Sequence, residues 1–200
     1  MTAIIDYGSG NLFSLGAALT KLGEQYLITS KESEILAADR IILPGVGEAS
    51  GLIKFIKNNE IDLIIEKSTV PVLGICIGMQ LLCNYSEEGE TRCLGYFNTI
   101  VKKLKADLVK VPHMGWNRVT SLKGPLFSDI IEGEWFYFVH SYAPQLCDET
   151  SSTTDHGLSI SSSLLSGRFF GTQFHPEKSG KAGERLLRNF INLNKSSVQL

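Results

Sequence analysis

The sequence has few cysteines and no long apolar run, and each shortage excludes a class of protein. Its 4 cysteines, Cys76, Cys83, Cys93 and Cys147, form no CxxC pair, so neither a zinc site nor a thioredoxin-like redox motif is indicated. We expect free thiols, most of them buried packing residues. No apolar run is long enough to span a bilayer, and the first residues lack a secretory signal. We therefore expect a cytoplasmic protein with no metal and no membrane partner.

The chain also lacks an excess of charge of either sign. It has 19 Lys and Arg against 21 Asp and Glu, a net charge of -2. Nucleic-acid binding needs clustered basic residues that neutralise phosphates, so no nucleic-acid partner is expected. The hydrophobic share of 43% and the charged share of 20% are ordinary for a globular protein. We expect one domain over residues 1–200, large enough to bury roughly 70% of the surface that the unfolded chain exposes.

Short apolar runs of strand type alternate with helical patterns from the beginning of the chain. Strands are predicted over residues 2–6, 40–43 and 70–75, and helices over residues 12–22, 49–58 and 61–66. In the second half, strands are predicted near residues 100–103, 135–139, 158–162 and 168–172, before a closing helix over residues 182–193. The alternation favours an α/β sheet with helices on its faces.

One cysteine lies where a predicted strand meets a predicted helix. Residues 74–78 read GICIG, the thiol counterpart of the GxSxG elbow, in which a nucleophile occupies a sharp strand-to-helix turn. The flanking glycines relieve crowding in such a turn, and the positive end of the following helix favours the reactive thiolate. Cys76 is therefore the predicted nucleophile. The alternative is a structural cysteine buried between two packing glycines.

A cysteine nucleophile needs a base, and residues 172–177 (TQFHPE) offer one after a strand-like run. His175 follows Cys76 by about 100 residues, a normal separation for a Cys/His pair. Pro176 restricts His175 to an extended backbone, so Glu177 is expected to point to the same side of the chain. Its carboxylate can then orient the imidazole and stabilise the protonated form. Considered alone, a histidine before a proline is more often a loop residue than a catalyst, and only the combination with the elbow favours the catalytic role.

Three other histidines compete for the role of base. His113 lies in a PHMGWN segment, His140 follows a strand-like run, and His156 lies in a Ser/Thr/Asp-rich stretch that is expected to be exposed. None of them has a carboxylate two residues away, as His175 has. His140 is expected to be a hydrogen-bonded residue at a strand end, with a place in the pocket as the alternative.

Together these residues resemble the class I glutamine amidotransferases, and among them the glutaminase subunits of imidazole glycerol phosphate synthase. The resemblance covers nearly the whole chain and rests on DYGSGN (6–11), PGVG (44–47), GICIGMQ (74–80), PHMGWN (112–117), VHSY (139–142) and FHPEKS (174–179). The elbow and the HPE segment are shared by the wider class, whereas PHMGWN and HPEKS point to the subfamily. The implied fold is a doubly wound, mostly parallel, flavodoxin-like α/β sheet flanked by helices, with additional antiparallel strands in the second half.

The resemblance also implies a role for each matching residue. Cys76 is the nucleophile, His175 the general acid and base, and Glu177 its orienting partner, and no cofactor takes part. The substrate, L-glutamine, is expected to lie against Gly47, Gln80, Ser141 and Tyr142. The backbone N–H groups of Val46 and Ile77 are expected to form the oxyanion hole.

The implied partner is a (βα)8-barrel cyclase that forms a heterodimer with the chain and uses the ammonia in histidine biosynthesis. Asn11, Trp116, Tyr137 and Lys178 are expected to lie near that partner. For Trp116 the alternative is a core aromatic residue, although an indole can pack and bind a partner at once.

Two segments depart from the family pattern and leave the acceptor of the ammonia open. Residues 93–95 read CLG where the family usually has GLG, and the helix after Gly47 begins with Glu48, Ala49 and Ser50 rather than with bulkier apolar residues. Related glutaminases feed other acceptors, such as amidine formation in surface-sugar biosynthesis. A catalytically silent regulatory subunit and a cysteine peptidase or thiol hydrolase of related fold are the remaining alternatives.

Overall fold

A computed structural model describes residues 1–8, 12–105, 107 and 109–193. The described residues form a seven-stranded sheet with the strand order β11-β12-β13-β4-β3-β1-β2. Its parallel strands are β1 (Thr2–Ile5), β2 (Tyr26–Thr29), β3 (Arg40–Leu43), β4 (Val72–Ile75) and β13 (Phe169–Thr172). At one edge, β12 (Ser159–Ser166) and β11 (Thr150–Asp155) continue the sheet with antiparallel pairing.

The central strands are apolar because both faces of the sheet are covered. Successive side chains of a strand point to opposite faces, and the burial follows this rule. Ile4 and Ile42 belong to one buried apolar cluster, whereas Ile5 and Leu43 belong to the other, and all four are fully buried. Strands buried on both faces are expected to read as continuous hydrophobic runs, which is how β1, β3 and β4 read.

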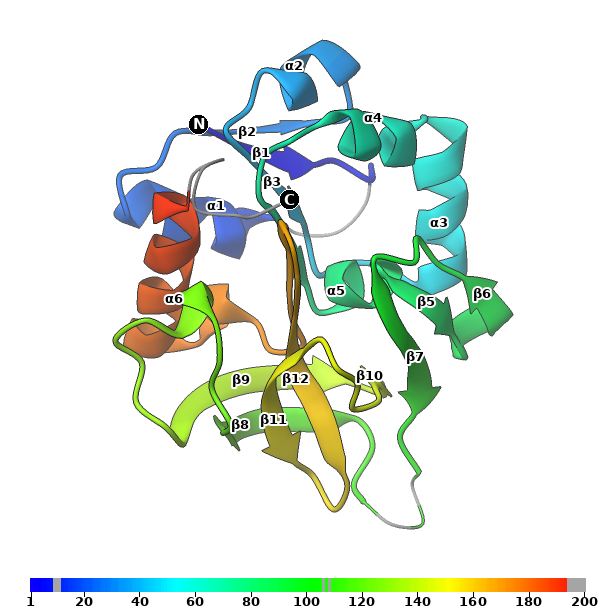
Figure 1. The fold of residues 1–200 in the computed structure, drawn as a ribbon, viewed down its shortest axis with the longest axis vertical. Helices are drawn as coiled ribbons and strands as arrows, with labels where there is room; N and C mark the ends of the chain where they lie inside the picture. The colour runs from blue at the N-terminus through cyan, green and yellow to red at the C-terminus, as the bar shows by residue number, and fades with distance from the viewer. Residues whose placement is uncertain (9–11, 106, 108, 194–200) are drawn as a thin grey trace.

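Helices cover both faces of the sheet, as Figure 1 shows. One face is packed by α1 (Phe13–Lys21) and α6 (Gly180–Asn192), which contribute Leu19 and Leu186 to the core. The other face is packed by α2 (Glu32–Leu36), α3 (Ala49–Asn58), α4 (Ile61–Lys67) and α5 (Ile77–Leu81). This doubly wound arrangement confirms the expected fold class.

The remaining strands extend the fold below the carboxyl ends of the parallel strands (Figure 1). A four-stranded sheet contains β5 (Cys83–Ser86), β6 (Thr91–Arg92), β7 (Phe97–Lys103) and β10 (Tyr142–Pro144). A two-stranded antiparallel ribbon is formed by β8 (His113–Val119) and β9 (Glu134–His140). The described residues also contain three short 3-10 turns: η1 (Glu88–Glu90), η2 (Pro125–Phe127) and η3 (Pro176–Lys178). The antiparallel strands expected in the second half are thus present.

The predicted elements agree with the structure best where the apolar pattern is strong. The strand over 40–43 and the helix over 49–58 have the predicted bounds. The helix predicted after Cys76 is present but short, because α5 ends at Leu81 and Cys83 begins β5. No helix of the described ranges is long and apolar enough to cross a bilayer.

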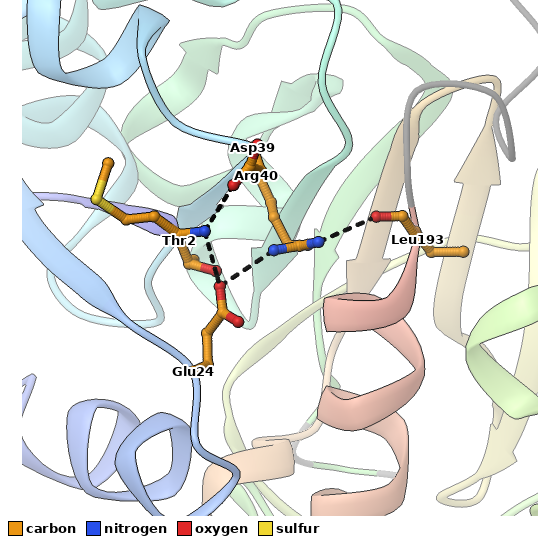
Figure 2. A network of polar contacts seen from close by, with 6 residues as sticks. Thr2, Glu24, Asp39, Arg40 and Leu193 are labelled. Atoms are coloured by element: carbon orange, nitrogen blue, oxygen red, sulfur yellow. Dashed lines mark hydrogen bonds and ion pairs between the residues drawn. The ribbon is translucent and has the colours of Figure 1, made fainter.

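A polar cluster joins four segments at the amino ends of the parallel strands. It lies at the opposite end of the sheet from Cys76, which follows the carboxyl end of β4, and Figure 2 shows it from close by. Glu24 lies at its centre and accepts hydrogen bonds from Thr2 Oγ1 at 2.7 Å and Arg40 Nη1 at 3.1 Å. The Arg40 Nη2 donates to the backbone oxygen of Leu193 at 3.3 Å, just after α6. The side chains of Glu24 and Arg40 are only 12% and 13% exposed, so this ion pair is poorly screened by solvent.

Replacing Arg40 should therefore weaken the fold. In Arg40→Met, Glu24 loses a partly buried counter-ion and Leu193 loses a donor, and we expect a loss of about 1 to 3 kcal/mol in the free energy of unfolding. Urea denaturation measures this change. The same substitution at the exposed Arg188 is the control and should stay within about 0.5 kcal/mol. Equal stability of both variants would contradict the role given to the cluster.

Candidate active site

Cys76 occupies a sharp turn between β4 and α5. Its backbone has φ +50° and ψ −110°, a conformation that L-residues with a side chain rarely adopt. The Cys76 N–H donates to the Thr172 oxygen at 2.6 Å, which continues the pairing of β4 with β13 beyond the strand end. The side chain is 8% exposed. The sequence therefore folds into the elbow that the GICIG motif predicts.

Glycines make the elbow possible because neighbouring backbone and side chains approach them closely. A Cβ on Gly74 would lie 2.5 Å from the Met79 nitrogen, and one on Gly78 would clash with the backbone oxygen of Leu43. A Cβ on Gly45 would lie 2.8 Å from His175 Cε1 and 3.1 Å from Cys76 Cβ. Because a Cβ at this position would be too close to His175, the glycine allows the loop after β3 to pack against both His175 and Cys76.

His175 and Glu177 form a buried pair after β13. The Nδ1 of His175 lies 2.7 Å from Glu177 Oε1, and the two side chains are 6% and 9% exposed. The backbone of His175 is extended, as Pro176 predicts, but Glu177 lies in the 3-10 turn η3. The expectation that both side chains project from one extended segment is therefore wrong in detail, since the turn brings them together. Ser179, which the sequence analysis missed, fixes this turn by donating to the His175 oxygen at 2.6 Å.

The environment of His175 favours its protonated form. Burial alone lowers the pKa of the imidazole, but hydrogen bonds to Cys76 and Glu177 and the negative charges of both groups outweigh burial and raise the pKa from 6.5 to about 10. His175 therefore carries a positive charge at neutral pH. A protonated imidazole next to a thiol can hold a thiolate and can later donate a proton to a leaving group.

A pocket of about 210 Å³ lies beside Cys76. All four residues that were expected to hold the substrate line it, namely Gly47, Gln80, Ser141 and Tyr142. The wall also contains Glu88 from η1, a carboxylate that the sequence analysis missed. One Glu88 oxygen, Oε2, accepts the Ala49 N–H at 2.9 Å. A carboxylate on the wall of a small pocket suits a ligand that carries a positive charge.

Gln80 is held so that only one of its polar atoms remains available. Its Nε2 donates to the Tyr142 oxygen and to Gln173 Oε1, each at 2.9 Å. Both N–H protons of the amide are then used. Toward a ligand in the pocket, Gln80 can therefore offer its Oε1 as an acceptor, and no donor.

The two residues expected to form the oxyanion hole lie on either side of the site. Ile77 lines the pocket beside Cys76, and its backbone N–H has no hydrogen-bond partner within the part of the chain that the structure describes. Val46 lies in the loop after β3 and lines a second pocket of about 100 Å³, together with His175, Glu177 and Lys178. Cys76 thus lines the first pocket, and His175 lines the second.

The competing histidines are tied to one another rather than to Cys76. His140 Nδ1 donates to the Tyr142 oxygen at 2.9 Å, so its Nε2 accepts from His113 Nδ1 at 3.0 Å. Burial lowers the pKa of His113 to about 4 and that of His140 to about 3, so both are neutral at neutral pH. His140 is both the hydrogen-bonded strand-end residue and a pocket residue. His156 is half-buried, not exposed, and stacks on His113.

Three of the four residues expected near a partner share one face. Trp116 and Tyr137 lie opposite each other in the β8–β9 ribbon, with ring centroids 6.1 Å apart. Trp116 is 53% exposed, so it is not a core residue, and a Cβ on Gly180 would lie 4.0 Å from its ring. This contact places the indole beside the turn that carries the exposed Lys178. Asn11 lies outside the described residues.

Another, larger cavity does not share the residues of this site. It has a volume of about 700 Å³, lies between α1 and β2, and has none of the residues of the Cys76 pocket in its wall. In the described ranges, no group of three His, Cys, Asp or Glu side chains is arranged to hold a metal ion.

Known proteins resemble the chain over nearly its full length. The family model for class-I glutamine amidotransferases matches residues 3–193. The chain is 46% identical over 193 residues to the imidazole glycerol phosphate synthase subunit HisH of Bacteroides fragilis, a match that covers 96% of this chain and 98% of that protein. The subunit of the same name from Vibrio parahaemolyticus is 42% identical over 197 residues, with 95% and 97% covered.

A solved structure agrees with the fold. The crystal structure of a glutamine amidotransferase matches with a TM-score of 0.73, 17% sequence identity, and coverage of 94% of this chain and 96% of that one. At this identity the likeness concerns the arrangement of strands and helices alone.

The strained backbone at Cys76 predicts an unusual order of stabilities. A non-glycine residue in this conformation costs about 1 to 3 kcal/mol, whereas glycine adopts it freely and loses only about 0.5 to 1 kcal/mol of chain entropy. Cys76→Gly should therefore be more stable than Cys76→Ala by about 1 to 2 kcal/mol in urea denaturation. The exposed Ala17 in α1 is the control, because Ala17→Gly should destabilise by about 1 kcal/mol. If Cys76→Ala were the more stable variant, the elbow would not be strained.

Glu177 should hold the pKa of His175 high. In Glu177→Gln the negative charge is lost while the shape is kept, so the pKa of His175 should fall by about 1 to 3 units, as followed by NMR of the imidazole. Because the folded pKa exceeds the unfolded one, protonation of His175 stabilises the wild-type fold below pH 6.5, and this contribution is lost as the pH rises through about 10. Glu177→Gln should lose this contribution to stability at a lower pH than the wild type. Glu184→Gln on α6 is the control, and an unchanged His175 titration in Glu177→Gln would contradict the pairing.

Proposed function

Because the chain belongs to the class-I glutamine amidotransferases, we propose that it is the glutaminase subunit of an imidazole glycerol phosphate synthase. In this role it hydrolyses the side-chain amide of L-glutamine and passes the ammonia to a synthase partner. One observation carries the proposal: Cys76, in a strained elbow, faces a protonated His175 that is paired with Glu177 at the edge of a pocket. The names of the full-length relatives support the pathway.

The pocket residues suit glutamine in its zwitterionic form. Glu88 can receive the α-ammonium group of the substrate. Both protons of the Gln80 amide are already bonded, so Gln80 faces the substrate with its Oε1, which can accept a proton of the ammonium group. Gly47, Ser141 and Tyr142 complete the wall against which the rest of the substrate lies. The side-chain amide of the substrate then points to Cys76.

The reaction is a two-step acyl transfer. Cys76 Sγ attacks the amide carbon, the carbon–nitrogen bond breaks, and ammonia leaves with a proton from His175. Water then attacks the thioester while His175 accepts a proton, which releases glutamate and restores Cys76. The N–H groups of Ile77 and Val46 stabilise the oxyanion of both steps, and each such donor is worth roughly 3 to 4 kcal/mol of barrier.

The ammonia leaves through the second pocket. His175 and Glu177, the proposed partners of Cys76 in the reaction, line this pocket together with Val46 and Lys178. Free ammonia is mostly protonated in water at neutral pH and then no longer a nucleophile, so a docked acceptor enzyme preserves its reactivity. The partner is a (βα)8-barrel cyclase that binds over the exposed Trp116 and Lys178 and the half-buried Tyr137, with Asn11 as a further contact.

Glutamate release from glutamine tests this function. We expect slow release by the chain alone and faster release when the barrel cyclase and its acceptor are present. Cys76→Ser should reduce the rate by a factor on the order of 10³ or more, with unchanged circular dichroism. Cys147→Ser, which alters a thiol outside the pocket, is the matched control and should keep the wild-type rate.

Two results would decide against parts of the proposal. Wild-type activity in Cys76→Ser would exclude the cysteine mechanism. Stimulation only by the synthase of another acceptor, such as a surface sugar, would keep the glutaminase and assign it to a different pathway.

A further inference from the structure

A buried glutamine contacts Cys76 and has no role in the two acyl-transfer steps. Gln173 follows β13, and its backbone N–H donates to the Ser162 oxygen at 2.8 Å, which keeps the segment in register with β12. Its side chain is fully buried. The Nε2 of Gln173 lies 3.5 Å from Cys76 Sγ, and its Oε1 lies 2.9 Å from Gln80 Nε2. The amide therefore bridges the thiol and the pocket wall.

The orientation of this amide follows from its neighbours. The Tyr142 oxygen is a backbone carbonyl and can only accept, so the atom of Gln80 that faces it must be the nitrogen. The second proton of that nitrogen then points to Gln173, which must present its oxygen. The nitrogen of Gln173 is left facing Cys76, so an N–H group, and not a carbonyl, is directed at the sulfur.

A donor at this place matters because the helix after Cys76 is short. α5 has five residues, about one and a half turns, so its dipole contributes less than that of a longer helix. An N–H group that points at sulfur stabilises a thiolate more than a thiol, since hydrogen bonds to charged acceptors are the stronger ones. In a buried site, where water does not compete, this preference increases.

We propose that Gln173 is a further catalytic residue, whose side-chain N–H donates to Cys76 Sγ and favours the thiolate before attack and after hydrolysis of the thioester. Gln80 is then a positioning residue for Gln173 as well as a wall of the pocket. The inference rests on the proposed function for its catalytic meaning, but the contact itself can be tested without glutamine.

The test is the rate of Cys76 alkylation by iodoacetamide as a function of pH. Gln173→Met keeps most of the side-chain volume and removes the donor. The midpoint of the pH profile should rise by about one unit, so that the rate near neutral pH falls about tenfold. At high pH, where the thiolate forms in both proteins, the variant should react as fast as the wild type or faster, because a less stabilised thiolate is the better nucleophile. A residue that only packs would not produce this crossing of the two profiles.

Other groups near Cys76 are the same in both proteins and so cancel in the comparison. The titratable side chains that surround it are His175, Glu177, His140, Glu88 and Tyr142. The remaining thiols react slowly, because burial raises the pKa of Cys93 to about 12 and also raises the pKa of Cys83 and Cys147. Peptide mass spectrometry identifies the alkylated cysteine, and Cys76→Ala gives the background rate.

Two further variants sharpen the result. Gln173→Glu is isosteric and presents an oxygen to the sulfur, so it should raise the midpoint more than Gln173→Met. Gln145→Met makes the same change as Gln173→Met at an exposed glutamine and should leave the profile unchanged. A wild-type profile in folded Gln173→Met would overturn the proposal.

A measurement on the unaltered chain covers the case in which these variants do not fold. The NMR chemical shifts of the Gln173 side-chain amide protons should change as Cys76 ionises, and this change should be absent in Cys76→Ala. Amide signals that titrate identically in both proteins would overturn the proposal. If the alkylation profiles differ as expected but the chain does not hydrolyse glutamine, the proposed function fails and the contact between Gln173 and Cys76 stands.

Discussion

The close approach of α5 to β3 fixes the position of Cys76, and the site depends on this contact. Gly78 packs against the backbone oxygen of Leu43, and Gly74 packs against the first turn of α5, with no room for a Cβ at either position. Cys76 therefore has to turn sharply between them, in a conformation that costs energy for any residue with a side chain. The buried sheet, apolar on both faces, supplies the stability that holds this strain. A nucleophile on a flexible loop would have no such fixed direction.

The polar groups of the site come from the carboxyl ends of strands of two sheets and from the loops that follow them. β4 brings Cys76, β13 brings Gln173 and His175, and β9 brings His140. Each of these side chains is buried and bonded to at least one other group. In surroundings of low polarity such contacts are stronger than in water, so they set both the protonation and the direction of the reacting groups. The positive charge on His175 shows this effect, because burial alone would lower its pKa and only the contacts with Cys76 and Glu177 raise it.

Much of the fold could be predicted from the sequence, but the polar interior could not. β3 has the predicted bounds because it is a short continuous apolar run that ends before Pro44, and α3 has them because its apolar residues follow a helix period. β11 was missed because Ser151 and Ser152 are buried through hydrogen bonds to serines of β12, which hydrophobicity does not detect. In the site, residue type and spacing suffice to select Cys76 and His175. Glu88 and Gln173 could not be found in this way, since their roles depend on contacts between segments far apart in the chain.

The direct test of a covalent mechanism at Cys76 is to trap the intermediate. The chain is mixed with glutamine, the reaction is stopped with acid during the first turnover, and the peptides are analysed by mass spectrometry. A glutamyl thioester on the peptide that contains Cys76, absent from Cys76→Ser, is the predicted result. Glutamate that forms while no adduct appears on Cys76 at any time would show that hydrolysis proceeds without the thioester and would contradict the mechanism.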